Sequence, residues 1–318
     1  MRPYALIDLH CDTLTDCKYA AGNPDTLDDP KRVLSLSAIP DDVHWAQFFA
    51  IFIPDEERGR AAIDYFGQNH RNFVRQMKRF SDRVSPCRGL GDMEAAFAQS
   101  KTAAFLTVEN GSVLAGDLSR VRVLAEAGVC AITLVWNGEN EIGSGHGTGH
   151  GLSAFGRAVI PEMERCGILV DVSHLNDPGF EDLLEVAQKP FLATHSNARA
   201  VAGHRRNLTD EMIRAMGERG CLIGLNYCAS FLDANPDRHA VESRVTDMAR
   251  HARYLCDLGG EDILALGSDF DGIGGRLELT GAQDMPKLAD GLLRAGFTER
   301  QVEKIFYKNA MRFFEENL

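Results

Sequence analysis

The chain has 318 residues, of which 44% are hydrophobic and 25% are charged, a composition typical of a globular protein with a large core. Its formal net charge of -12 argues against nucleic acid or an anionic membrane as a partner, because both require a basic face. The eight cysteines include no C-x-x-C pair, so we expect free thiols in a reducing cytoplasm and no disulfide scaffold.

The first predicted element is the apolar run 5–9, a buried strand that starts almost at the N-terminus, so we expect no signal peptide. No apolar run approaches the roughly 20 residues that span a bilayer. Because strand side chains alternate between faces, His10 and Asp12 point the same way from the strand end. An imidazole beside a carboxylate favours a metal site, although a core histidine next to an exposed aspartate is the plainer interpretation of this motif alone.

Strand-like and helical runs then alternate along the chain. A polar stretch over residues 15–42 is predicted to be a long loop. Further strands are predicted over residues 45–53, 103–108, 129–135, 168–172, 191–194, 221–226 and 263–267. Helices are predicted over residues 60–80, 118–127, 153–166, 177–188, 209–219, 245–258, 285–294 and 299–316.

This alternation predicts a parallel sheet covered by helices. Eight units without a linker suit a single (β/α)8 TIM barrel with C-terminal helices, and we expect residues 1–318 to form one domain. An open doubly wound sheet is the alternative, but the first strand lacks a G-x-G-x-x-G turn. In a closed barrel, all strand C-termini meet at one mouth, where active sites lie.

Polar residues of metal-ligand or acid–base type follow several of these strands. They are His10, Asp12, Glu109, His174, His195 and Asp269. Five ligands exceed what one zinc ion needs. The first two can hold one ion and the two later histidines a second, and Glu109 could bridge them. Two ions about 3.5–4 Å apart can trap a shared hydroxide and polarise a carbonyl, which leaves Asp269 free to act as the base.

The chain resembles the membrane (renal) dipeptidase family, a branch of the metal-dependent amidohydrolase superfamily, over nearly its whole length. The segments that carry the resemblance are Asp8-Leu9-His10-Cys11-Asp12, Val108-Glu109-Asn110-Gly111, Asp171-Val172-Ser173-His174, Thr194-His195-Ser196, Arg205-Arg206-Asn207 and Gly267-Ser268-Asp269-Phe270-Asp271-Gly272. The resemblance implies two zinc ions, bound by His10, Asp12 and Glu109 and by Glu109, His174 and His195. It also implies that Arg206 holds the substrate carboxylate, that Asp269 is the catalytic acid–base group, and that a D-residue is tolerated at the C-terminal position.

One position departs from that family, whose best-known members carry a histidine just after the fourth strand, on the side of the scissile carbonyl. Here Trp136-Asn137 follows that strand. Asn137 could bind the substrate by a hydrogen bond instead, His146 or His150 could reach in, or the metals could act alone. The glycine-rich run 143–151 lacks the Lys-Ser/Thr of a phosphate loop, and we interpret it as a mobile lid.

We therefore expect a dinuclear zinc dipeptidase that uses a metal-bridging hydroxide, with Asp269 as general acid and base, on dipeptides that include L,D forms. One alternative is another metal-dependent amidohydrolase, acting on a small amide or N-acyl amino acid, or a deaminase or phosphoester hydrolase. Those branches typically start with His-x-His, and several bridge their metals through a carbamylated lysine, which no predicted strand end supplies here. A non-catalytic metal-binding protein should have lost Asp269 or a ligand. A homodimer is possible.

Overall fold

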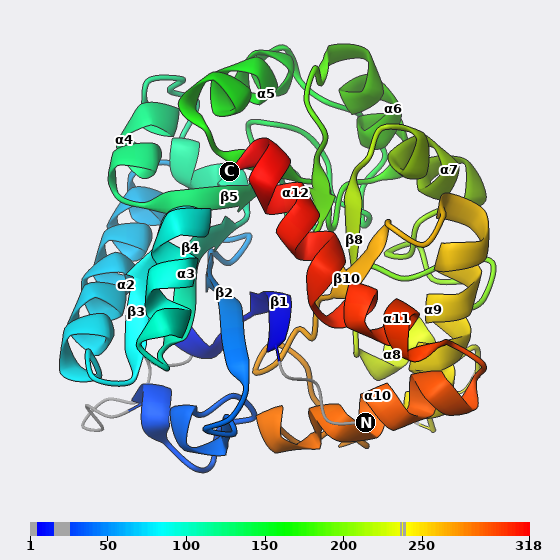
Figure 1. Ribbon diagram of the computed structural model, residues 1–318. Helices are drawn as coiled ribbons and strands as arrows, with labels where there is room; N and C mark the ends of the chain where they lie inside the picture. Colours follow the sequence, from blue (N-terminus) through cyan, green and yellow to red (C-terminus); the bar gives the residue numbers. More distant parts are fainter. Residues whose placement is uncertain (1–4, 16–25, 236, 238–239) are drawn as a thin grey trace.

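The computed structural model describes residues 5–15, 26–235, 237 and 240–318. Part of the predicted loop over 15–42 and the N-terminus on which the signal-peptide expectation rests lie outside these residues. Eight parallel strands close into a barrel in the order β2-β1-β10-β8-β7-β6-β5-β4, and β4 pairs back onto β2 (Figure 1). These strands are β1 Ala5–Cys11, β2 His44–Phe52, β4 Thr102–Glu109, β5 Val129–Thr133, β6 Leu169–Asp171, β7 Leu192–Ala193, β8 Leu222–Leu225 and β10 Leu264–Leu266. The predicted TIM barrel is confirmed.

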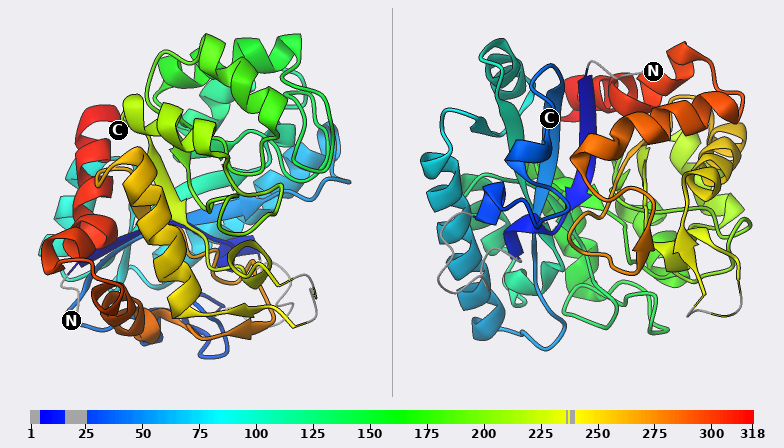
Figure 2. Two further views of the ribbon diagram at one scale, coloured as in Figure 1. Left: turned by 90° about the vertical axis from the view of Figure 1, so that its right-hand side faces the viewer. Right: turned by 90° about the horizontal axis from the view of Figure 1, so that it is seen from below.

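Helices surround the barrel on its outer side (Figure 2). They are α2 Arg60–Arg79, α3 Leu90–Ala98, α4 Arg120–Glu126, α5 Ala154–Cys166, α6 Asp177–Val186, α7 Asp210–Glu218, α9 Val245–Gly259 and α10 Met285–Arg294. The last predicted helix is continuous but contains a π-helical segment, and comprises α11 Glu299–Glu303, η5 Lys304–Lys308 and α12 Asn309–Asn317. Within the described ranges no helix combines the length and apolar character that a membrane crossing demands.

Short elements complete the fold. They are α8 Ala229–Leu232, η1 Thr26–Asp28, η2 Leu36–Ala38, η3 Gly111–Leu114, η4 Ala282–Asp284 and the paired strands β9 Glu242–Ser243 and β11 Arg276–Leu277. A further strand, β3 Val84–Cys87, pairs with the first half of β4. The sequence prediction missed β3 and α3. The apolar run that forms β3 is short, and Pro86 argues against a central strand. Proline is tolerated there since β3 pairs only with β4, and an edge position needs no N–H donor.

The core has two layers. One end of the barrel stays open. One apolar cluster lies inside the barrel and includes Ile7, Leu9 and Phe105, while the other packs between strands and helices. Helix α12 crosses the N-terminal end of the barrel (Figure 1), where Phe314 stacks on Phe48 at 5.5 Å between ring centroids. The loops that follow the strands gather at the opposite end (Figure 2). Polar side chains can therefore collect only at that mouth.

A bulge in β1 directs the first polar motif into the mouth. Asp8 pairs with Gln47 and Cys11 with Phe49, so β1 carries one residue more than β2 over this stretch. Leu9 faces the barrel interior, and strict alternation would turn His10 outward. The extra residue reverses the alternation, so that His10 reaches the mouth while Cys11 packs in the outer layer.

Candidate active site

A cavity of about 600 Å³ lies at the mouth of the barrel. Four of the six predicted polar residues line it, namely Asp12, Glu109, His174 and Asp269, together with Asn137. The remaining two, His10 and His195, are buried beneath them, and their rings stack at 3.8 Å between centroids. The structure thus brings together all six residues that the sequence analysis selected from five strand ends.

Glu109 lies at the centre of the cluster, and its two oxygens face different histidines. Oε1 lies 2.8 Å from His174 Nε2 and 3.7 Å from His195 Nε2. Oε2 lies 3.6 Å from His10 Nε2, which is also 3.5 Å from Asp12 Oδ2. One carboxylate thus contacts two separate donor groups, as a ligand shared by two ions must.

The two later histidines present their Nε2 atoms to each other, 3.1 Å apart. Thr194 Oγ1 donates to the Asp171 carboxylate, so it accepts from His195 Nδ1 at 2.8 Å and leaves that ring's lone pair on Nε2. Asn137 Oδ1 likewise accepts from His174 Nδ1, at 3.2 Å. Two facing lone pairs repel, and a cation between them would remove the repulsion. The hydrogen bonds therefore fit a metal ion held by both rings.

The other half of the cluster also fits a cation. His10 Nε2 and Asp12 Oδ1 are buried and have no hydrogen-bond partner among the described residues. Ligands about 2.1 Å from a tetrahedral ion lie roughly 3.4 Å apart, close to the 3.5 Å between His10 and Asp12. His10, Asp12 and Asp269 also place ligand atoms within 4.8 Å of one another, as do His10, Glu109 and His195. By geometry alone, Asp269 can serve either as a ligand or as a free base.

Burial and mutual charge shift the pKa values of these groups in different directions. Burial lowers the pKa values of His174 and His195 well below the ordinary value, and the positive charge of Arg206 adds to this. Burial also opposes the charged form of His10, but its hydrogen bonds with Asp12 and Glu109 outweigh that effect and hold its pKa well above the ordinary value. The rings of His174 and His195 are thus neutral, as metal ligands must be.

The carboxyl group of Asp269 has a strongly raised pKa. Burial raises its pKa to about 8, opposed by His10 and reinforced by the negative charges of Asp12 and Glu109. Its Oδ2 accepts from Asn226 Nδ2 at 3.0 Å, and its backbone has a φ of 62°. A carboxyl group whose pKa lies near neutral pH, placed beside the cluster, can both accept and donate a proton.

Two buried aspartates that the sequence analysis did not select hold the strand ends in place. Asp8 accepts from Gln47 Nε2 at 3.0 Å and from the backbone N and Oγ of Ser268, which joins β2, β1 and the end of β10. Asp171 accepts from Thr133 and Thr194, which joins β5, β6 and β7. The available signal was a polar residue inside an apolar strand.

Two further residues near the carboxylates of Asp12 and Asp269 were also missed. Asn226, which holds Asp269, ends the seventh predicted strand but carries a neutral side chain and was not counted with the ligands. Gly272 approaches both carboxylates, since a Cβ there would lie 2.0 Å from Asp12 Oδ2 and 2.6 Å from Asp269 Oδ1. Only glycine fits this position without a shift of the site.

Of the adjacent arginines Arg205 and Arg206, the first is exposed and the second is buried, with 4% of its surface accessible. Arg206 donates to Ser196 Oγ and to the His195 carbonyl oxygen, both at 2.9 Å. Its guanidinium carbon lies 5.8 Å from the centre of the Phe231 ring, and Phe231 lines the cavity. Arg206 therefore lies just behind the cavity wall.

The glycine-rich run forms a strap that is hydrogen-bonded to the site, and its interpretation as a mobile lid stays a prediction. His146 N donates to the His174 carbonyl oxygen at 2.8 Å, and Asn176 Nδ2 donates to the carbonyl oxygens of Thr148 and His150. A Cβ on Gly145 would lie 1.9 Å from a backbone oxygen, so this glycine permits close approach of two backbones. The strap places His146 beside His174, whereas His150 is exposed.

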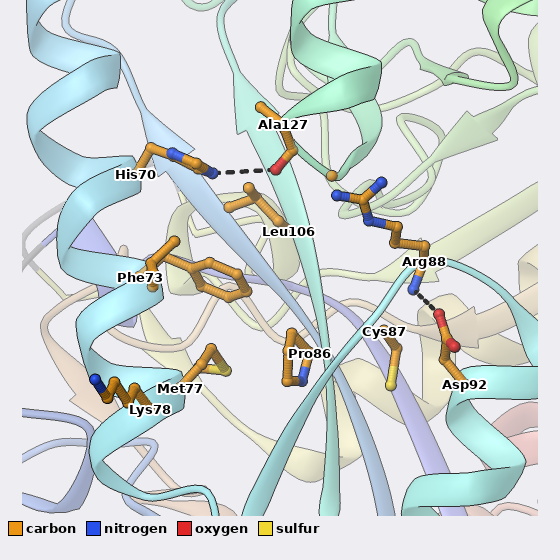
Figure 3. A pocket seen from close by; sticks show the side chains of 12 residues that line it. His70, Phe73, Met77, Lys78, Pro86, Cys87, Arg88, Asp92, Leu106 and Ala127 are labelled. Carbon is orange, nitrogen blue, oxygen red and sulfur yellow. Dashed lines mark hydrogen bonds between the residues drawn. The ribbon is translucent and has the colours of Figure 1, made fainter.

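A second cavity, of about 610 Å³, lies on the outside of the barrel between α2 and the start of α3 (Figure 3). Phe73 and Met77 form an apolar wall, and His70 Nε2 contacts the Ala127 carbonyl oxygen at 3.0 Å. Arg88 donates to the neighbouring Glu126 carbonyl oxygen. The side chains of His70 and Arg88 therefore both bind carbonyl oxygens at the C-terminal end of α4. No group of metal-ligating side chains is found there among the described residues.

Comparison with known proteins is consistent with this geometry. The profile of a family described as membrane dipeptidase, peptidase family M19, matches residues 1–317. The uncharacterized protein in the pqqA 5' region of Klebsiella pneumoniae is 34% identical over 79% of this chain and 95% of its own length. Dipeptidase tcpJ of Claviceps purpurea is 29% identical over 76% of this chain but only 57% of its own length.

Two solved structures share the whole fold. One is a metallopeptidase from Rhodobacter sphaeroides liganded with a phosphinate mimic of the dipeptide L-Ala-D-Ala, with a TM-score of 0.93, 25% identity and full coverage of both chains. The other, described as the dipeptidase AC, also has a TM-score of 0.93, at 26% identity and 99% coverage of both chains.

Proposed function

Since this chain belongs to the membrane dipeptidase family, peptidase family M19, and is a metal-dependent dipeptidase, we propose that it cleaves L,L and L,D dipeptides with two zinc ions. The observation that carries the proposal is the orientation of Glu109, whose two oxygens face His174 and His10. The structural relative that binds a mimic of L-Ala-D-Ala supports the stereochemical part. The predicted cytoplasmic location and homodimer stay predictions.

The ligand sets follow from the contacts around Glu109. His10 and Asp12 would hold one ion with Oε2 of Glu109, and His174 and His195 would hold the other with Oε1. When bound, two such ions supply an activated water and polarise the scissile carbonyl. Thr194, itself bonded to Asp171, accepts from His195 Nδ1, and Asn137 accepts from His174 Nδ1. These bonds keep the Nε2 lone pairs of the two later histidines directed at the cluster.

Arg206 would bind the C-terminal carboxylate of the substrate. Its guanidinium is buried, it donates to two neutral oxygens, and no ion pair to it is found among the described residues. A buried charge with neutral partners gains most from a bound anion, and a guanidinium matches a carboxylate in bidentate geometry. This arrangement would select substrates with a free carboxyl end.

Asp269 would carry the proton between the attacking water and the leaving amine. The amide nitrogen is a poor leaving group until it is protonated, and a carboxylate beside the site of attack can take the water's proton and deliver it to that nitrogen. Asn226 fixes the carboxylate through Oδ2, so Oδ1 remains directed at the cluster, 3.9 Å from His10 Nε2. Asn137, whose Oδ1 orients His174, would also offer its amide nitrogen to the substrate.

The decisive experiment combines elemental analysis with a screen of dipeptides. The purified zinc-loaded protein should hold two ions per chain and cleave L-Ala-L-Ala and L-Ala-D-Ala, and Glu109→Ala should lose both ions. Arg206→Ala should raise KM at least about tenfold, because a charge-assisted pair contributes on the order of 1.5–3 kcal/mol. One ion per active chain, or equal rates on C-terminal amides, would contradict the dinuclear site or the carboxylate clamp respectively.

A further inference from the structure

Two buried side-chain nitrogen atoms beside the ligand cluster have no hydrogen-bond partner among the described residues. They are Nε of Arg206 and Nδ1 of His146. Leaving such a group unpaired in the interior is unfavourable, and more so for a charged group. Their positions on two different segments therefore point to a ligand that both can reach.

The two groups face the same corner of the site. The His146 ring lies 5.9 Å from the rings of His174 and His204, and His204 lies 4.8 Å from Phe231. Phe231 in turn covers the Arg206 guanidinium and lines the cavity. The charged groups that act on His146 are Arg206, His204 and Arg205, all of them basic. An anion is the ligand that this corner would attract.

The strap holds His146 in a fixed position. Its backbone N donates to the His174 carbonyl oxygen, Gly147 N donates to the Asn137 carbonyl oxygen at 3.1 Å, and the strap pairs with Leu175 through Gly145. A side chain fixed in this way loses little conformational entropy when it binds a ligand. The backbone that carries the ring is therefore anchored, and in its Nδ1–H tautomer the ring offers a preorganised hydrogen-bond donor.

We propose that His146 determines substrate specificity by donating a hydrogen bond from Nδ1 to the C-terminal carboxylate of the dipeptide, alongside Nε of Arg206. This rests on the proposed function. A carboxylate has two oxygens and can accept from both donors, whereas a water molecule would leave the Arg206 charge without a counter-ion. The carboxylate enters the corner from the cavity past the Phe231 ring, which shields the ion pair from solvent.

The test compares variants that keep or remove the donor at the Nδ1 position. His146→Ala should raise KM for L-Ala-D-Ala about tenfold, with kcat changed less than about threefold, and should leave KM for L-Ala-D-Ala amide unchanged. His146→Asn places an amide where Nδ1 lies and should restore much of the loss, whereas His146→Gln places it nearer Nε2 and should not. His150→Ala is the matched control, because His150 lies in the same strap but is exposed.

Two results would overturn the inference. His146→Ala could behave as His150→Ala does, or it could lower kcat equally on acid and amide with loss of bound zinc, which would make His146 a support for His174. Calorimetric binding of D-alanine and D-alanine amide to zinc-loaded wild type and His146→Ala gives a readout without turnover. If wild type cleaves no dipeptide, the proposed function fails, and a D-alanine preference abolished by His146→Ala would still establish the carboxylate site.

Discussion

At the residue scale, the proposed mechanism depends on Asp269, a carboxylate that the proposed ligand sets do not require. Asp269→Asn preserves shape and the position held by Asn226 but cannot transfer a proton. We expect kcat for dipeptide hydrolysis to fall about 10²–10⁴-fold, the usual share of general acid–base catalysis, while elemental analysis still finds two ions. If the folded variant loses an ion instead, Asp269 completes the ligand group of His10 and Asp12, and another residue must carry the proton.

At the element scale, His251 on α9 ties two segments of the mouth together. Ala198 N donates to its Nδ1 at 3.1 Å, and its Nε2 contacts the Leu232 carbonyl oxygen at 3.1 Å, at the end of α8. Burial lowers its pKa to about 4, against about 6.5 in the unfolded chain. The unfolded chain therefore binds the proton more tightly, and stability is lost as the pH falls from about 6.5 to about 4.

The contribution of His251 to the pH dependence of stability can be measured. His251 should make the free energy of unfolding about 2 kcal/mol smaller at pH 5 than at pH 8, and His251→Gln should lack that component. Denaturant titrations of both proteins at the two pH values give the difference, which separates His251 from the other titrating groups. Parallel pH curves for the two proteins would mean that His251 does not titrate in this range.

At the scale of the whole molecule, metal removal should weaken the protein without unfolding the barrel. The strands and α12 pack through apolar side chains, so their secondary structure does not require ions. Each ion at 1,000-fold excess over its Kd contributes about 4 kcal/mol, so complete chelation should lower Tm by at least about 8 °C with an unchanged far-ultraviolet circular dichroism spectrum. An unchanged Tm after verified chelation would show that the cluster binds no stabilising ion.

The sequence predicted the eight barrel strands because each is a short apolar run between helical segments. The same rule failed for β3, where Pro86 interrupts the pattern and edge pairing compensates. Nor did the sequence show how the strap packs, because the close approach of Gly145 to a backbone oxygen depends on a residue outside the glycine-rich run. The supporting roles of the neutral residues Asn226 and Thr194 were not predicted, because they depend on Asp269 and Asp171, which are distant in the chain.

By itself, the sequence determined the alternation of strands and helices and the chemical type of each strand-ending residue, since both are local properties. Only the tertiary structure decided that a bulge turns His10 inward, that one oxygen of Glu109 faces this histidine and the other faces the two later histidines, and that Arg206 rather than Arg205 is buried. The physical reason is that register, side-chain orientation and burial arise from contacts between residues that are distant in sequence.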